Sequence, residues 1–427
     1  MRIQLAWTIF TEFLVMLSGA LVLKFAASLL GPAGFGEYAL GRRVVGLVYL
    51  PLIMGLGIAA PRYIAIARTA VLKEYAESSF AFATFTAGLF PVLIVALAMN
   101  LTPSTFSRLI FGSSSHSHLI APASLALVGL TLHSLVYAVH RGRSEMRFAN
   151  ALQMVNLGVM PIAAFALGER TAAGVIGTMG LAWVVVAGAA LLHLAYLERD
   201  KWPGVVSIRQ HLRVLLRFGL PRVPGEFALV GIFALPALIA VRTQGLIVAG
   251  QFSAAMSLLT ITSGVFAPVG LVILPRASAQ AASGDIAGVR RLVIRILVGG
   301  TFLSVAGVIL GEVLIPPFIR WYFGPAFTPG IPVFRACLLG AVPYVVYVLM
   351  RNILDALDVR PINARNLTIS LAVLVLLCLV RSNIMWMAWS LTGSLTLLGA
   401  LTLREVYVRL GSPIDTVSVP LAAEMPT

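Results

Sequence analysis

The stretch EFLVMLSGALVLKFAASLLGPAGFGEYALGRRVVGLVYLPLIMGLGIAAPR, residues 12–62, decides the fold because its landmarks return 214 residues later. The matching positions are Glu12-Phe13 with Glu226-Phe227, Gly31 with Gly245, Gly36 with Gly250, and Pro61-Arg62 with Pro275-Arg276. The register holds without slippage across two apolar segments and the turn between them. It therefore predicts that the chain contains two copies of one membrane-embedded unit.

The composition places both copies in a membrane. Hydrophobic residues make up 59% of the chain and charged residues 11%, and the mean hydropathy is +0.96. A membrane-spanning helix needs about 20 apolar residues, and long stretches rich in Leu and Ala meet this requirement in both halves. We predict an all-α polytopic protein with about twelve spans, six in each half. They lie near 7–30, 38–60, 79–99, 119–139, 148–168, 172–196, 226–242, 246–274, 292–315, 331–350, 366–380 and 383–403.

The positions of the basic residues predict the orientation. With the amino terminus inside, most of the 31 Lys and Arg residues fall in the inner segments, as expected for cytoplasmic loops. We therefore expect a multi-pass protein of the cell inner membrane with both termini in the cytoplasm. The net charge of +15 then reflects topology, and no nucleic-acid partner is expected. Glu12 and Lys24 interrupt the first apolar run, which argues against a cleaved signal peptide.

The repeat and the spans together predict the domain organisation. An amphipathic helix with Arg209, Arg213 and Arg217 at every fourth residue is expected to lie on the inner leaflet, in contact with membrane lipids. The predicted parts are an N-terminal six-helix lobe at 1–196, a basic cytoplasmic linker at 197–225, a C-terminal six-helix lobe at 226–410 and a cytoplasmic tail at 411–427.

No pattern indicates soluble catalysis or a metal site. Cys337 and Cys378 lie in apolar stretches and suggest no disulfide framework. His116 and His118 lie in a Ser-rich outer loop without an acidic or thiol partner nearby in the sequence, so we interpret them as solvated loop residues. We expect no cofactor and no enzymatic activity.

Three cations lie within the first two predicted spans, where ionisable side chains are costly and are candidates for function. Lys24, Arg42 and Arg43 are expected at a similar depth, roughly 6–9 Å below the outer boundary at 1.5 Å of rise per residue. They either extend to the headgroups or bind a shared anionic ligand. We favour the shared ligand because three cations gather there with Glu37 as the one acidic neighbour.

Two carboxylates form a second signal. Glu12 and Glu226 are symmetry mates, each about a turn and a half inside the first span of its half. Each could carry a proton or cation, stabilise a helix amino terminus or pair with an Arg. Pro221 and Pro224 flank Arg222 and should kink the chain there, leaving Arg222 to turn towards the same space as Glu226.

The chain also resembles a known family. The turn LGPAGFGEYA at 30–39, followed by Pro51, GLG at 55–57 and PRYIA at 61–65, looks like the opening of the Wzx-type polysaccharide flippases. These belong to the multidrug/oligosaccharidyl-lipid/polysaccharide exporter superfamily. In the second half, FGLP at 218–221, QFSAA at 251–255 and LPR at 274–276 extend the similarity.

The resemblance implies a transporter. Its two six-helix lobes would be related by a pseudo-two-fold axis along the membrane normal and would exchange access to a central cavity between the two membrane faces. The implied substrate is an undecaprenyl-diphosphate-linked oligosaccharide for cell-surface polysaccharides such as the O-antigen of lipopolysaccharide, with polysaccharide-assembly proteins as partners. Lys24, Arg42, Arg43 and Arg222 would then bind the diphosphate. Where many relatives have an Asp-Arg pair, this chain has Pro236-Ala237, which puts ion coupling in doubt.

Two alternatives remain open from the sequence. An ion-coupled multidrug exporter of the same superfamily would use Glu12 or Glu226, although an excess of buried cations disfavours cationic drugs. A membrane glycan polymerase or ligase would need a reactive group on the outer face, where the loops offer only scattered His and Ser.

Overall fold

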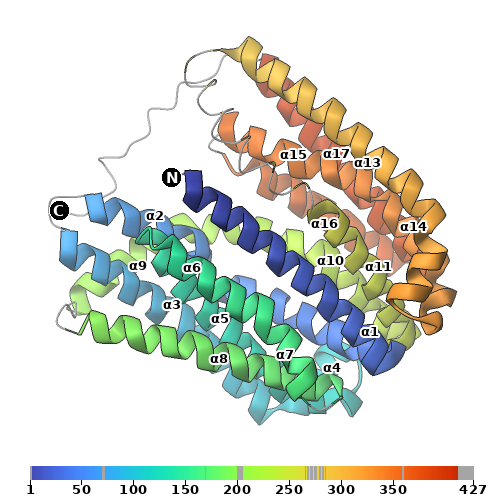
Figure 1. Cartoon of the computed structure of the whole chain (residues 1–427), viewed down its shortest axis with the longest axis horizontal. Helices are drawn as coiled ribbons and strands as arrows, with labels where there is room; N and C mark the ends of the chain where they lie inside the picture. The colour runs from blue at the N-terminus through green and yellow to red at the C-terminus, as the bar shows by residue number, and fades with distance from the viewer. Residues whose placement is uncertain are drawn as a thin grey trace. The chain divides into compact units, whose positions relative to one another are not determined.

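The computed structural model consists of helices and short connections (Figure 1). It describes residues 2–69, 73–168, 170–199, 205–264, 285–357 and 360–411, with scattered positions between 266 and 283. Every regular element in these ranges is helical, which confirms the predicted all-α class. The predicted tail beyond Gly411 and the repeat landmark Pro275-Arg276 lie outside the described residues.

The chain divides into two compact units that meet between Val223 and Pro224 in the sequence. The helices of the first unit are α1 (Arg2–Ile53), α2 (Leu56–Thr69), α3 (Lys73–Leu101), α4 (Pro103–Phe111), η1 (Ser114–Leu119), α5 (Ile120–Gly142), α6 (Met146–Gln153), the π-helix η2 (Met154–Val159), α7 (Met160–Leu167), α8 (Ala172–Leu197), α9 (Val205–Gly219) and η3 (Leu220–Arg222).

The second unit contains the remaining helices and begins within the first turn of α10. Its elements are α10 (Val223–Gln244), α11 (Leu246–Gly264), α13 (Ile286–Tyr322), η4 (Pro325–Gly330), α14 (Ile331–Leu339), α15 (Ala341–Leu357), α16 (Ile362–Val380) and α17 (Ile384–Gly411). Large apolar side chains such as Phe302 are well exposed on these helices, as expected for surfaces that face lipid.

The helices are long and apolar enough to account for the predicted spans. Ten candidate spans occur in the described residues, and a shorter apolar helix covers Leu246–Ile261. One of the ten, Trp7–Ile53, contains two helices joined at Gly31, so the expected number of about twelve is reached. The chain is therefore a multi-pass membrane protein by fold.

The repeat appears directly in the backbone. Gly31 has a φ of 67° and its symmetry mate Gly245 a φ of 84°, a conformation that glycine adopts without steric cost. Only Gly31 is non-helical between residues 2 and 53, so residues 32–38, expected as part of a turn, form the start of the second helix. Pro32 suits a first helical turn because its fixed φ matches the helix and its missing N–H needs no partner there.

A second break separates α1 from α2 at Met54 and Gly55, which both have positive φ, 50° and 71°. A Cβ added to Gly55 would lie 2.5 Å from the carbonyl oxygen of Gly219. The two backbones therefore touch where α9 ends. This contact fixes the start of α2 against the end of α9.

The amphipathic helix predicted in the linker is α9, and its apolar face packs onto the first unit. Leu215 is fully buried in a cluster with residues of α2, α3 and α5, and His211 packs edge-on against Phe80 at 4.4 Å. Arg209, Arg213 and Arg217 are exposed on the opposite side. The apolar residues of α9 are thus used for packing within the protein, and its arginines remain accessible.

Candidate functional site

The first unit contains a cavity of about 330 Å³ with largely apolar walls and one cation. Arg42 is the charged residue in its lining, and the Arg42 Nη1 donates a hydrogen bond to the buried hydroxyl of Tyr38 at 3.2 Å. The other lining residues come from both parts of α1 and from α5, η2, α7 and α8: Val15, Gly19, Val45, Gly46, Ala126, Leu130, Leu157, Pro161, Ile176, Met179 and Trp183. The sequence-predicted cation Arg42 therefore lies at a cavity.

A row of polar contacts runs along the first helix beside this cavity. Gln153 Nε2 donates to Glu12 Oε1 at 3.0 Å, and Asn150 Nδ2 donates to Thr8 Oγ1 at 3.1 Å. Farther along, the Ser18 hydroxyl donates to the carbonyl of Gly158. The first helix is thus joined by hydrogen bonds to α6 and η2. Glu12, predicted as an ion-coupling or structural residue, takes part in this row.

The helix that contacts the first helix through these hydrogen bonds is irregular beside the cavity. Residues 154–159 form a π-helix, a local insertion that is frequent at functional sites. Asn156 is fully buried there: its Nδ2 lies 3.3 Å from His133 Nδ1, and its carbonyl accepts from Trp183 Nε1 at 2.5 Å. Its Oδ1 has no hydrogen-bond partner among the described residues. A buried amide oxygen without a donor can accept from a ligand or a water.

The resemblance assigned four cations to a diphosphate, and three of them lie on the two helices that meet at Gly31. Lys24 precedes the turn at Gly31 by seven residues, and Arg42 and Arg43 follow it by eleven and twelve. At 1.5 Å per residue, these positions are about 10 Å and about 17 Å from the turn along their helices. Arg222 lies in η3, three residues after Gly219, whose backbone contacts Gly55 at the end of the second helix.

Arg222 is instead brought close to Arg62, a residue that the sequence analysis did not select. The guanidinium carbon of Arg222 lies 3.7 Å from the ring centroid of Phe218, and that of Arg62 lies 4.7 Å from the same centroid. Arg222 Nη1 also donates to the Phe218 carbonyl at 2.6 Å. In the sequence, Arg62 belongs to the repeated Pro-Arg pair and Arg222 lies at the kink between the two halves. Only the fold brings the two residues together.

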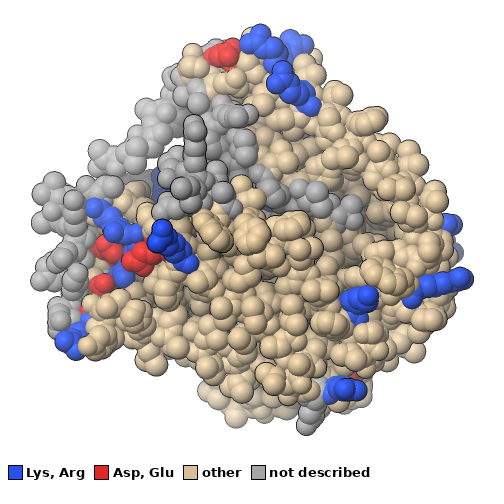
Figure 2. All heavy atoms as spheres, viewed as in Figure 1, with Lys and Arg blue, Asp and Glu red and all other residues tan. Residues whose placement is uncertain are grey.

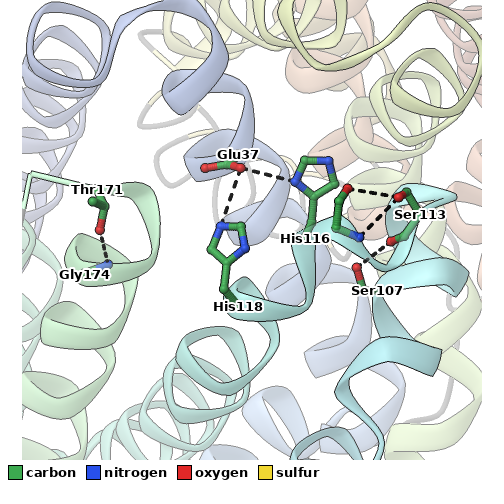
Figure 3. A network of polar contacts seen from close by, with 8 residues as sticks. Glu37, Ser107, Ser113, His116, His118, Thr171 and Gly174 are labelled. Carbon is green, nitrogen blue, oxygen red and sulfur yellow. Dashed lines mark hydrogen bonds and ion pairs between the residues drawn. The ribbon is translucent and has the colours of Figure 1, made fainter.

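Glu37 and the two loop histidines form a contact at the turn end of the unit (Figure 3). His116 Nδ1 lies 3.2 Å and His118 Nε2 lies 3.6 Å from Glu37 Oε1, which joins α1 to η1. The prediction that the histidines have no acidic partner nearby was wrong, because Glu37 is distant in sequence but adjacent in space. His118 is exposed, as predicted for a solvated residue. Among the described residues no group of three or more His, Cys, Asp or Glu side chains could hold a metal ion.

At the opposite end of the first unit, a cluster of charges joins four helices. Arg143 is 6% exposed and makes ion pairs with Glu77 at 2.8 Å and Glu198 at 2.9 Å. Ser78 donates to Glu198 at 2.6 Å, and Arg68 donates to the Arg143 carbonyl. Figure 2 shows basic and acidic side chains mixed near the ends of α2, α3 and α8.

In the second unit Glu226, the symmetry mate of Glu12, lies in the first turn of α10. A carboxylate there faces the positive end of the helix dipole. In the described part of the second unit, Glu405 of α17 forms ion pairs with Arg365 of α16 at 2.7 Å and with Arg409 at 3.6 Å. The cations Lys24, Arg42 and Arg43 of the first unit correspond to Leu238, Met256 and Ser257, so the repeat is chemically unequal.

The sequence profile described as "Polysaccharide biosynthesis protein" matches residues 4–280 of the chain. The chain belongs to this family. The match covers the whole first unit and the start of the second, and it confirms the resemblance seen at residues 30–65. No individually curated protein matches the sequence of this polysaccharide biosynthesis family member.

Solved structures with the same fold include transporters of the MATE family. An inward-facing multidrug resistance MATE family transporter of the MOP superfamily is similar with a TM-score of 0.79 and 12% identity, covering 95% of this chain and 98% of that one. The eukaryotic MATE transporter AtDTX14 is similar with a TM-score of 0.66 and 12% identity, covering 95% and 94%. At such identities the likeness establishes the fold of this family member and leaves its substrate open.

Proposed function

We propose that this protein moves a lipid-diphosphate-linked oligosaccharide from the inner to the outer leaflet of the cell inner membrane, for the synthesis of surface polysaccharide such as O-antigen. The carrier is of the undecaprenyl-diphosphate type. The observation that carries this proposal is Arg42 at the otherwise apolar cavity of the first unit. Family membership and the transporter fold support it.

The chemistry of the cavity suits an amphiphilic anion. In a low-dielectric environment the attraction between a cation and a phosphate far exceeds its value in water. Arg also donates two parallel hydrogen bonds to phosphate oxygens. Lys24 and Arg43 lie on the two helices that are joined at Gly31 and add positive charge, which would repel cationic drugs. Transport by alternating access of the two six-helix units is part of the proposal.

The decisive test is flux of a fluorescent lipid-diphosphate oligosaccharide in proteoliposomes. We expect the combined change of Lys24, Arg42 and Arg43 to Gln to lower flux at least about tenfold. A matched triple change removes Arg290, Arg291 and Arg295, which are exposed on α13, and should leave flux within about twofold. Intact flux in the first triple variant would refute the proposed cation site.

A multidrug exporter is the second candidate, and one observation favours it. Glu12, hydrogen-bonded to Gln153 within a span, could exchange a proton or cation as a drug leaves. Accumulation of a cationic dye in cells separates the two functions. We expect dye accumulation to be the same with and without the gene, and a gene-dependent decrease would favour the exporter.

A further inference from the structure

We propose that Arg62 and Arg222, held around Phe218, form an anion-receiving site that binds the diphosphate group at the basic end of the first unit. This inference rests on the proposed function for the identity of the anion. The Arg62–Arg222 site is distinct from the cavity lined by Arg42, because Arg62 follows Arg42 by about twenty residues along α1 and α2.

The first argument is the proximity of two like charges. Both guanidinium carbons lie near one ring, at 4.7 and 3.7 Å from its centroid, so their separation is at most the sum of these distances. Cation–π attraction offsets part of the repulsion between them. An anion that binds beside the two groups lowers this repulsion further. A diphosphate, with two adjoining charged groups, can bridge such a pair.

The second argument is that the ring that both arginines contact is held firmly. Phe218 meets Tyr63 edge to face at 5.6 Å, and Tyr63 stacks on Phe80 at 5.6 Å. Tyr63 is 5% and Phe80 3% exposed. Stacking uses the flat face of a guanidinium, so the N–H groups at the edge of the exposed Arg62 can donate to phosphate oxygens. Both arginines are therefore oriented before a ligand arrives.

The third argument is the backbone geometry that creates the site. Arg62 is on α2, and Phe218 and Arg222 are at the end of α9 and in η3. These segments are pressed together by the contact between Gly55 and Gly219, where a Cβ would meet a carbonyl oxygen at 2.5 Å. The contact thus sets the spacing of the two arginines.

The fourth argument concerns the acidic residues at the same end. Glu77 and Glu198 make their ion pairs with Arg143, and Glu145 contacts His140. In the described part of the chain, Arg62 makes no ion pair with any carboxylate, and its side chain is exposed. Arg62 thus offers an accessible cation to an anion from outside the protein. The distribution of basic residues assigns this end to the cytoplasm, where the substrate would be assembled.

The test is calorimetric titration of the purified full-length protein with inorganic pyrophosphate. We expect binding by the unaltered protein, and Arg62→Gln and Arg222→Gln should each weaken it roughly tenfold or more. Arg62→Lys keeps the charge but loses the planar donor edge, and should give an intermediate loss. Arg213→Gln is the matched control, because Arg213 is exposed on α9 at the same end of the unit, and should leave affinity within about twofold.

Three results would overturn the inference: no pyrophosphate binding, full binding by Arg62→Gln, or an equal loss in Arg213→Gln. Phe218→Leu provides a second route. It should weaken binding while the protein still unfolds at a similar temperature, since Leu fills most of the same apolar space. If pyrophosphate binds as expected but proteoliposomes move no lipid-linked oligosaccharide, the proposed function fails and the anion site stands. If flux is present and Arg62→Gln binds pyrophosphate normally, the inference alone fails.

Discussion

Gly55 and Gly219 are in backbone contact, and this contact joins the break in the second span to the end of α9. A Cβ on Gly55 would lie 2.5 Å from the Gly219 carbonyl oxygen and 2.8 Å from its Cα. Gly55 also has a φ of 71°, which disfavours any side chain. Neither segment can move away without separating Arg62 from Phe218.

Gly55→Ala should therefore lower the free energy of unfolding by about 1–3 kcal/mol, through overpacking and backbone strain. Thermal unfolding in detergent measures the effect. Gly57→Ala is the matched control, because no atom lies within 4 Å of a Cβ there, and it should unfold at the temperature of the unaltered protein or slightly above. An unchanged midpoint in Gly55→Ala would show that the two segments can separate at no cost.

Arg143→Gln should destabilise the first unit by about 3 kcal/mol, because it leaves Glu77 and Glu198 without their shared cation. The measurement is again unfolding in detergent. Arg147→Gln, four residues away on the exposed side of α6, is the control and should change stability by less than about 0.5 kcal/mol. Equal stability of the two variants would mean that the charge cluster contributes nothing to holding the helices together.

Glu37→Gln should loosen the segment that contains His116 and His118. The contact is partly exposed, with His118 52% accessible in its side chain, so its contribution is on the order of 1 kcal/mol or less. Amide hydrogen exchange in residues 114–119 should become up to about fivefold faster. Glu312→Gln, in the second unit, should leave this segment unchanged. Unaltered exchange after Glu37→Gln would indicate that η1 is held by other contacts.

Glu12→Gln and Glu226→Gln should differ although the residues are symmetry mates. Glu12 is hydrogen-bonded within a span of the first unit, whereas Glu226 lies in the first turn of α10. We expect Glu12→Gln to lower flux at least about tenfold, because it removes a charge from within a span. Glu226→Gln should instead cost about 0.3–1 kcal/mol of stability through the lost helix-dipole interaction, with flux retained. Equal flux defects would show that the two carboxylates act alike.

Several features of the site could be predicted from the sequence because they depend on residues close together in the chain. The turn at Gly31 and its copy at Gly245 follow from a glycine between two apolar runs, and both have the positive φ that glycine favours. The cations within the first two spans stand out for the same reason, since charge is rare in apolar stretches. The bounds of the second helix were less accurate, because Pro32 starts a helix as readily as it ends a turn.

Other features needed the fold because their partners are far apart in sequence. Glu37 meets His116 across 79 positions, and Gln153 reaches Glu12 across 141. Arg62 and Arg222 share one ring although 160 residues separate them. No local pattern predicts such pairs. The periodicity of a helix shows which residues share a face, but it does not show which other helix that face packs against.

The order of residues alone identifies a helical membrane protein made of two related halves, because burial in lipid selects long apolar runs and a duplication preserves its register. The tertiary structure alone decided which charges meet. It placed Arg42 at a cavity, paired Arg143 with two carboxylates, and brought Arg222 and Arg62 to one aromatic ring. The physical reason is that electrostatic interactions depend on distance in space, which is set by helix packing and by backbone contacts such as that between Gly55 and Gly219.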